Sequence, residues 1–155
     1  PSSILNSGNS PVKALTEKKA DTYDIAILFA ALARAAGLPA QPIAGVLVDV
    51  AQTCYLHWWS EFYLEGFGWI PVDLGMAKAV PFDMGMSQRE SWYFGNLDAF
   101  RITFSRGLNI QPPMTANSTM VSKERNYAFY SAWEEYSGIT KYDSVWRIPE
   151  IIAVY

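Results

Sequence analysis

Apolar and polar positions change their period along the chain, and the helical period is clearest in one stretch near the N-terminus. Between Ile25 and Ala36 apolar residues recur every three or four positions, and Arg34 is the only charge there. This spacing predicts a helix that is buried on most sides. Gly37 is expected to end the helix, and Pro39 prevents its continuation.

Two residues at the start of this helix, Asp21 and Thr22, are candidates for its N-cap, because both side chains can accept a hydrogen bond from a free backbone N–H. Asp24 adds negative charge to the first turn, where the helix dipole favours it. A shorter helix is expected before it, over Val12–Lys19. Residues 1–11 are rich in Ser, Asn, Gly and Pro and are expected to form a lead-in segment.

Runs that are rich in β-branched and aromatic residues predict the strands of an antiparallel sheet. The short link Leu64–Gly66 predicts a three-residue hairpin with Gly66 in the left-handed conformation. With the buried helix, these strands predict an α+β fold. The four expected strands lie at Pro42–Asp49, Tyr55–Tyr63, Phe67–Leu74 and Arg101–Ser105.

The rest of the chain is less regular. No internal repeat or second-domain boundary is visible, so residues 12–155 are expected to form one domain. We expect a surface excursion over Gly75–Asp98, a loop over Gln111–Ser122, and a late hairpin of Tyr127–Tyr136 with Ser144–Ile148 around Ser137 and Gly138, although residues 128–136 also fit a helix.

The composition excludes several classes of function. The chain has 155 residues, half of them apolar, which suffices for one domain with a sizeable core. A net charge of −3 with scattered Lys and Arg argues against nucleic-acid binding. No apolar run is long enough to span a membrane. The chain starts at Pro1 without a signal-peptide pattern, which fits a mature or excised part of a longer protein.

The sequence has one cysteine, Cys54, and one histidine, His57. A disulfide within the chain is therefore impossible, and a zinc site of the usual Cys/His kind lacks ligands. No metal or cofactor is expected.

The alternation in the second strand places His57, Trp59 and Glu61 on one face. If the hairpin loop is centred on Glu65, His57 lies opposite Asp73, with Cβ atoms about 4.5–5.5 Å apart. Such a carboxylate can orient the imidazole and stabilise its cationic form. A helix whose N-terminus points at this pair would complete a site, because its dipole stabilises an anion.

Three segments occur in a characteristic order: "ADTYDIAILFAALARAAGLPAQ" (20–41), "HWWSEFYLEGFGWIPVD" (57–73) and "YFGNLDAFRITFSRG" (93–107). Together they resemble bacterial transglutaminase-like domains, which are related to the papain-type cysteine proteases. That family carries a Cys at the start of a helix block, then H-x-W-x-E, then G-W-x-P-x-D. The resemblance extends from about Ala20 to Gly107.

The resemblance implies a papain-like transglutaminase core with a catalytic triad. It assigns His57 as the catalytic histidine and Asp73 as the carboxylate that orients it. Thr22 stands where the family has its Cys nucleophile, while Ala20 replaces a Gly and Gln41 replaces an Arg. The family reaction is attack of a thiolate on an amide carbonyl. A threonine hydroxyl is far less acidic than a thiol and needs a well-placed base and oxyanion hole.

Thr22 therefore predicts a pseudoenzyme that keeps a His57/Asp73 cleft for peptide or protein binding, or that has a structural role. An active amide acyl transferase or hydrolase is the alternative, with Thr22 either as an unusual nucleophile or as an engineered replacement of a native Cys. The simplest interpretation of Thr22 itself is a helix cap.

Three other side chains bear on this site. Cys54 is expected on the face opposite His57 and hence to be a small core residue rather than a substitute nucleophile. Trp59 and Glu61 are candidate binding residues. Trp59 would form a hydrophobic wall of the hairpin or, because it shares the His57 face, line a ligand site. Trp69 would form a hydrophobic wall of the hairpin. Glu61 would be a partner of the site or an exposed strand residue. The basic residues, including those of Ser105–Gly107, are expected in turns and on solvated surface.

The resemblance also bears on partners and compartment. A peptide or protein is the implied substrate or ligand. Many members of the family are exported, which favours a periplasmic or secreted location. The sequence does not specify an oligomeric state.

Overall fold

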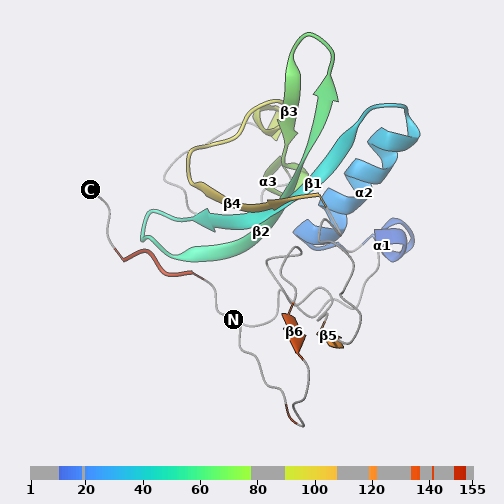
Figure 1. Cartoon of the computed structure of the whole chain (residues 1–155). Coiled ribbons are helices and arrows are strands. Elements are labelled where there is room, and N and C mark those ends of the chain that lie inside the picture. Colours follow the sequence, from blue (N-terminus) through green and yellow to red (C-terminus); the bar gives the residue numbers. More distant parts are fainter. Residues whose placement is uncertain are drawn as a thin grey trace.

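A four-stranded antiparallel sheet with one long helix packed against it forms the main body of the computed structural model (Figure 1). The strand order is β3-β2-β1-β4. The structure describes residues 11–18, 20–77, 90–107, 119–121, 134–136, 141 and 149–152. The elements of the main body are α1 (Pro11–Glu17), α2 (Thr22–Ala35), β1 (Ala40–Val48), β2 (Cys54–Leu64), β3 (Gly68–Val72), α3 (Leu74–Ala77), the 3-10 helix η1 (Glu90–Tyr93) and β4 (Arg101–Arg106). The predicted α+β class is confirmed.

The start of α2 is fixed by Asp21. This residue has an extended backbone, with φ −88° and ψ 177°, and its side chain accepts a hydrogen bond from the Asp24 amide at 2.8 Å. Thr22 is the first residue of the helix itself. The interpretation of Thr22 as the cap is therefore wrong, because its backbone is already helical and Asp21 supplies the accepting oxygen. At the other end Gly37 has φ +86°, as expected for the residue that ends a helix.

The helix α2 packs on the sheet through small residues. Ala26 and Ala30 are buried, and the Ser60 hydroxyl of β2 donates a hydrogen bond to the Ala26 carbonyl at 2.9 Å. Tyr23 meets the edge of Trp58, also on β2. The outer face, with Leu32 and other residues, is exposed. The helix is thus less buried than predicted, because it contacts the sheet along one face only.

The hairpin of β2 and β3 differs in register from the prediction. Its loop covers residues 65–67, with Gly66 at φ +82° in the expected left-handed conformation, and Leu64 faces Gly68. The loop is thus one residue later than predicted, which shifts every cross-strand pair by two residues. As a result β3 ends where Val72 pairs with Ser60, and Asp73 lies beyond the end of the strand.

The chain after the hairpin returns to the outer edge of β3. The Gly95 amide donates to the Pro71 carbonyl at 2.8 Å, and the Asp73 amide donates to the Tyr93 carbonyl at 2.9 Å. Strand β4 then pairs with β1, at the opposite edge of the sheet. The expected excursion over Gly75–Asp98 therefore includes ordered elements at both ends, while its central part, 78–89, lies outside the described residues.

A separate two-stranded sheet consists of β5 (Thr119–Val121) and β6 (Glu134–Tyr136). Thr119–Val121 was expected in a loop, so this prediction is wrong for these residues. The strand character of Glu134–Tyr136 was expected, but its observed partner is β5. The partner expected from the sequence, Ser144–Ile148, lies outside the described residues. In the described part of the chain no helix has the length and apolarity to cross a membrane.

Candidate functional site

His57 and Asp73 form a buried pair at the end of β3. The distance from His57 Nε2 to Asp73 Oδ2 is 2.6 Å, and both side chains are almost completely buried. His57 is held by β2, whereas Asp73 occupies the turn between β3 and α3. The contact expected from the sequence is present, although Asp73 reaches His57 from beyond the strand and not from the opposite position in the ladder.

The Asp73 carboxylate is shared among several donors. Arg101 Nη1 donates to the same oxygen, Oδ2, at 2.6 Å, and the Met76 amide donates to Oδ1 at 2.9 Å. Burial by itself raises the pKa of Asp73. The charge and hydrogen bond of His57, the charge of Arg101 and the Met76 amide outweigh burial, so the pKa lies below its usual value. Asp73 is therefore a carboxylate, as orientation of an imidazole requires.

Arg101 was not singled out by the sequence, yet it lies at the centre of the polar network. Its Nε and Nη2 donate to Asp98 Oδ2 at 3.0 and 2.8 Å, while Nη1 serves Asp73. The guanidinium also lies over the rings of Trp59 and Tyr93, at 5.3 and 5.8 Å from their centroids. The expectation that the basic residues occupy turns and solvated surface is wrong for Arg101, whose side chain is only 5% exposed.

Thr22 and His57 converge on one point above the Gly75 backbone. A methyl group built on Gly75 would lie 3.0 Å from Thr22 Cγ2, 3.3 Å from His57 Cε1 and 3.2 Å from Asp73 Oδ1. The first residue of α2 and the imidazole thus both border the Gly75 backbone, and they would crowd a side chain at position 75. Among the described residues, Thr22 makes no hydrogen bond to His57.

The Trp59 indole lies next to the His57 ring. It stacks on the His57 ring with centroids 6.2 Å apart and an interplanar angle of 21°. A Cβ on Gly45 of β1 would lie 2.8 Å from Trp59 Cη2 and 2.2 Å from the Ile102 carbonyl oxygen. Only glycine fits at position 45, because both the indole and the backbone of β4 approach it closely.

Glu61 is buried and ion-paired, so the expectation of an exposed strand residue is wrong. Arg106 Nη1 donates to both Glu61 oxygens, at 2.7 and 2.6 Å. The Gln41 amide nitrogen, from the facing position on β1, donates to Glu61 Oε1 at 2.6 Å. Glu61 therefore fixes the position of a cation on the surface and makes no contact with His57 in the structure.

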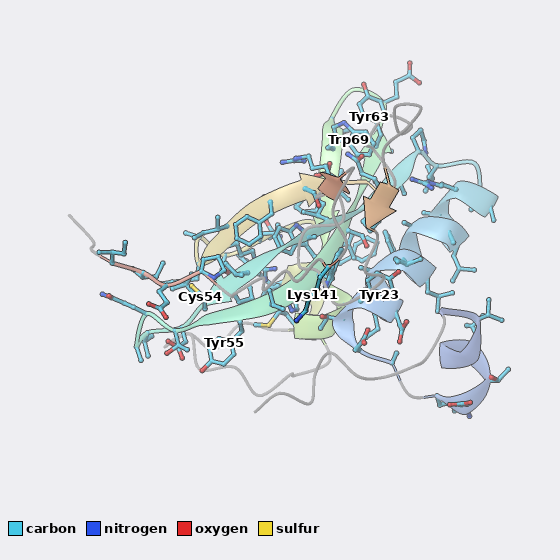
Figure 2. All side chains as sticks on the ribbon, turned by 60° about the horizontal axis from the view of Figure 1, so that its bottom comes forward. Tyr23, Cys54, Tyr55, Tyr63, Trp69 and Lys141 are labelled. Atoms are coloured by element: carbon cyan, nitrogen blue, oxygen red, sulfur yellow. The ribbon has the colours of Figure 1, made fainter. Side chains whose placement is uncertain are left out.

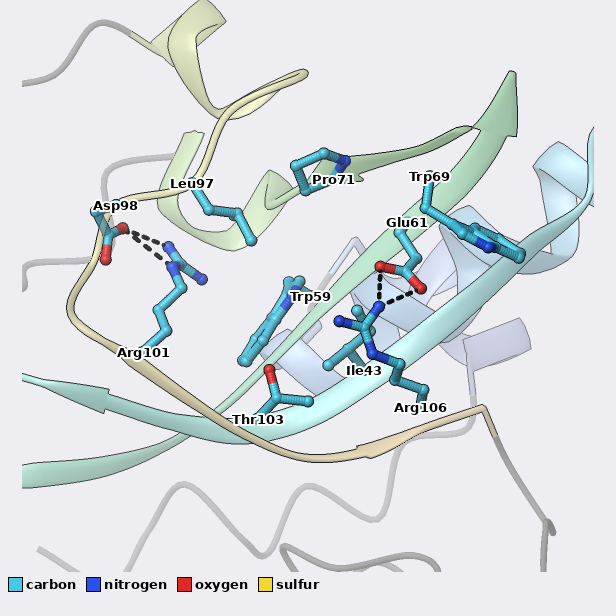
Figure 3. Close-up of a pocket in the computed structure, with 10 residues that line it drawn as sticks. All are labelled: Ile43, Trp59, Glu61, Trp69, Pro71, Leu97, Asp98, Arg101, Thr103 and Arg106. Carbon is cyan, nitrogen blue, oxygen red and sulfur yellow. Dashed lines mark hydrogen bonds and ion pairs between the residues drawn. The ribbon is translucent and has the colours of Figure 1, made fainter. Parts of the chain in front are cut away.

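A pocket of about 330 Å³ lies on this face of the sheet (Figure 3). Both predicted binding residues, Trp59 and Glu61, line it. Figure 3 shows Trp59 between two ion pairs, Asp98–Arg101 on one side and Glu61–Arg106 on the other. The remaining lining residues are Ile43, Trp69, Pro71, Leu97 and Thr103. Trp69 is 45% exposed, so it forms part of the rim rather than the interior.

Cys54 lies away from this site. It is a free, buried cysteine at the first position of β2, and Figure 2 shows it at the opposite end of the strand from Tyr63 and Trp69. Burial raises the pKa of the Cys54 thiol, and the negative charge of Asp49 raises it further. These surroundings disfavour a thiolate, and they agree with the role expected from the sequence, a small core residue. Among the described residues no three His, Cys, Asp or Glu side chains come together as a metal site.

Comparisons with protein families and with known proteins each found a similar sequence. Residues 1–74 match the family model of the transglutaminase-like superfamily. An uncharacterized protein of Haemophilus influenzae is 33% identical over 135 residues, an alignment that covers 66% of this chain and 36% of that protein. The chain thus spans about a third of the length of this relative. No solved structure matches the chain significantly. The part of the chain that carries Thr22, His57 and Asp73 is therefore similar to the transglutaminase-like core.

Proposed function

We propose that the chain contains a transglutaminase-like domain in which amide acyl transfer is absent or strongly impaired, and in which the His57–Asp73 cleft binds a peptide or protein segment. One observation carries the proposal. A threonine methyl group lies beside the His57 ring, at the start of α2, where the resemblance implies a thiol.

The chemistry of residue 22 supports a loss of catalysis. A cysteine at a helix N-terminus beside a histidine becomes a thiolate, because its pKa of about 8.5 is within reach of both effects. A threonine hydroxyl remains protonated under the same influence. The buried His57–Asp73 pair and the neighbouring pocket remain, and they support a binding function.

The test restores the thiol. In a Cys54→Ser background, Thr22→Cys gives a protein with a single cysteine, and its alkylation by iodoacetamide is followed as a function of pH. We expect this thiol to react about tenfold faster at pH 6 than N-acetylcysteine, because the helix dipole and His57 favour the thiolate.

The matched control carries His57→Gln in addition, and we expect its advantage over N-acetylcysteine to be largely lost. A thiol at position 22 that is no more reactive than N-acetylcysteine would show that the cleft is not electrostatically primed, and the proposed function would fall.

The alternative, Thr22 as an active nucleophile, is favoured by its position beside His57. It predicts an acyl adduct on Thr22 after incubation with p-nitrophenyl acetate, detected by peptide mass spectrometry and absent from a His57→Ala variant. We expect no adduct on Thr22 in the native protein. An adduct that depends on His57 would replace the pseudoenzyme by an unusual acyl transferase or hydrolase.

A further inference from the structure

The pocket in Figure 3 contains two arginines that differ in how many of their donors are used. Arg101 is buried, and its three nitrogens all donate to carboxylates, two to Asp98 and one to Asp73. Its guanidinium belongs to the internal network of the site. It has little capacity left for a ligand.

Arg106 is open to a ligand. Its side chain is 56% exposed, and within the described part of the chain its hydrogen bonds are made through Nη1 alone, to the two oxygens of Glu61. One nitrogen of the planar guanidinium is thus anchored, while the Nε and Nη2 donors make no hydrogen bond to any residue that the structure describes. Figure 3 shows this group next to Trp59 and Ile43, at the lining of the pocket.

Glu61 holds Arg106 in position. The carboxylate is buried, and it accepts an additional hydrogen bond from Gln41 across the β1–β2 ladder. A guanidinium that is oriented before the ligand arrives loses less conformational entropy on binding.

The unused groups define the chemistry of the ligand. An arginine presents donors only, so the ligand must supply acceptors, and a carboxylate matches the geometry of a guanidinium in two parallel hydrogen bonds. The rest of the lining is mixed: Ile43, Trp69, Pro71 and Leu97 are apolar, Thr103 is polar, and the carboxylates Glu61 and Asp98 are each paired with an arginine. A volume of about 330 Å³ lies at the lower end for ligand pockets, which fits one chain end or one side chain.

We propose that this pocket binds a carboxylate of a peptide and that Arg106 is the residue that recognises it. The inference rests on the proposed function, since it names the class of peptide that the His57–Asp73 cleft would receive. Trp59 connects the two places, because its indole lines the pocket and stacks on His57. A peptide whose carboxylate is held by Arg106 would extend along Trp59 toward the cleft.

The carboxylate has two possible sources, the C-terminus of the peptide or an acidic side chain. The first pair of probes is N-acetyl-Ala-Leu as the free acid and as the amide. The second pair is N-acetyl-Ala-Glu amide and N-acetyl-Ala-Gln amide. Each is titrated to millimolar concentration into the full chain labelled with ¹⁵N, and binding is followed by the backbone and indole signals. We expect at least one acidic probe to bind at least tenfold more tightly than its neutral partner.

The variants test whether Arg106 produces this difference. Arg106→Gln is expected to abolish the preference for the acid. Arg106→Lys is expected to keep part of it, because an ammonium retains the charge but cannot form the two parallel hydrogen bonds of a guanidinium. Lys18→Gln is the control. It removes an exposed cation between α1 and α2 that does not line the pocket, and it should leave binding unchanged. A Glu61→Gln/Arg106→Gln double variant, which leaves no unpaired buried carboxylate at this position, should also lose the preference.

Equal affinities for acid and neutral probes, no binding of any probe, or an acid preference that survives Arg106→Gln would each overturn the proposal. These outcomes are independent of the thiol test, because they are measured on a chain with Thr22 in place. A primed thiol without acid binding would refute only the pocket, whereas acid binding without a primed thiol would refute only the cleft.

Discussion

Arg101 joins two buried carboxylates at the centre of the site. Its guanidinium donates to Asp73 and to Asp98, and its faces lie against Trp59 and Tyr93. Removal of the cation would leave Asp98 without this partner, and Asp73 would keep only His57 and the Met76 amide as the partners described above. A buried carboxylate that loses its cation costs more free energy than the ion pair had contributed, because it cannot regain its hydration.

We therefore expect Arg101→Gln to lower the free energy of unfolding by about 3–5 kcal/mol. Urea denaturation followed by tryptophan fluorescence measures the change. Arg101→Lys should recover part of the loss, and the exposed control Lys18→Gln should change the free energy by about 0.5 kcal/mol or less. If Arg101→Gln is no more destabilising than Lys18→Gln, the network does not have the stabilising role described.

At the scale of the elements, the pairing of β1 and β4 decides which side chains share the pocket. Ala44 faces Ser105, whereas the next residue, Gly45, faces Thr103, so one residue of β4 is skipped at an irregularity in the ladder. In a regular strand Arg101 and Arg106 would point to opposite faces. The extra residue shifts the alternation of side chains by one position. Arg101 and Arg106 therefore point to the same face and line the same pocket.

The same irregularity makes Gly45 sensitive to substitution. A Cβ at this position would lie 2.2 Å from the Ile102 carbonyl oxygen, and this backbone atom cannot move without displacing β4. We expect Gly45→Ala to lower the free energy of unfolding by more than about 2 kcal/mol. Urea denaturation is again the measurement, and an unfolding free energy within about 0.5 kcal/mol of the native value would contradict the close packing of β1 on β4.

Gly75 provides the contrasting case, because its neighbours are side chains and not the backbone of a strand. A Cβ there would meet Thr22, Asp73 and His57 at 3.0–3.3 Å. In the single-cysteine protein with Thr22→Cys, we expect Gly75→Ala to lower the alkylation rate several-fold while its unfolding free energy falls by about 1 kcal/mol or less. Unchanged alkylation would show that Gly75 does not border the approach to residue 22.

At the scale of the whole molecule, Asp73 connects elements from different parts of the chain. It binds His57 of β2, Arg101 of β4 and the Met76 amide of α3. Near Asp73, backbone hydrogen bonds connect β2 with β3, and they also connect the end of β3 with η1 and the segment that follows it. Residues 90–106 lie beyond the part that matches the family model, yet they supply Arg101 and Asp98. The site is therefore complete only when both parts of the chain are folded together.

This arrangement predicts a loss of stability in acid. The pKa of Asp73 is lower in the folded protein than the value of about 3.9 expected in the unfolded chain. Its contribution is therefore fully present above the unfolded pKa, and it is lost as the pH falls through the folded pKa. We expect the urea concentration at the midpoint of unfolding to decrease as the pH is lowered below about 4. In the Asp73→Asn variant this decrease should be less steep. Parallel curves for the two proteins would contradict this role of Asp73.

The sequence by itself determined the features that depend on neighbouring residues. The helix α2 followed from apolar periodicity, the four strands of the main sheet followed from runs of β-branched and aromatic residues, and the conformation of Gly66 followed from its place in the turn. The shared face of His57, Trp59 and Glu61 followed from alternation. The hairpin register was wrong by two residues, but the contact of His57 with Asp73 survived, because a shift by two positions keeps every side chain on its face.

Only the tertiary structure decided what surrounds these residues. Arg101 meets a carboxylate 28 residues away, and Arg106 meets one 45 residues away. Both contacts depend on β4 pairing with β1 and on the irregularity between them. Neither the partner of an edge strand nor an extra residue in its ladder leaves a local pattern in the sequence. The charge network and the pocket therefore arise from long-range pairing, whereas the sequence marks Thr22, His57 and Asp73 through local motifs.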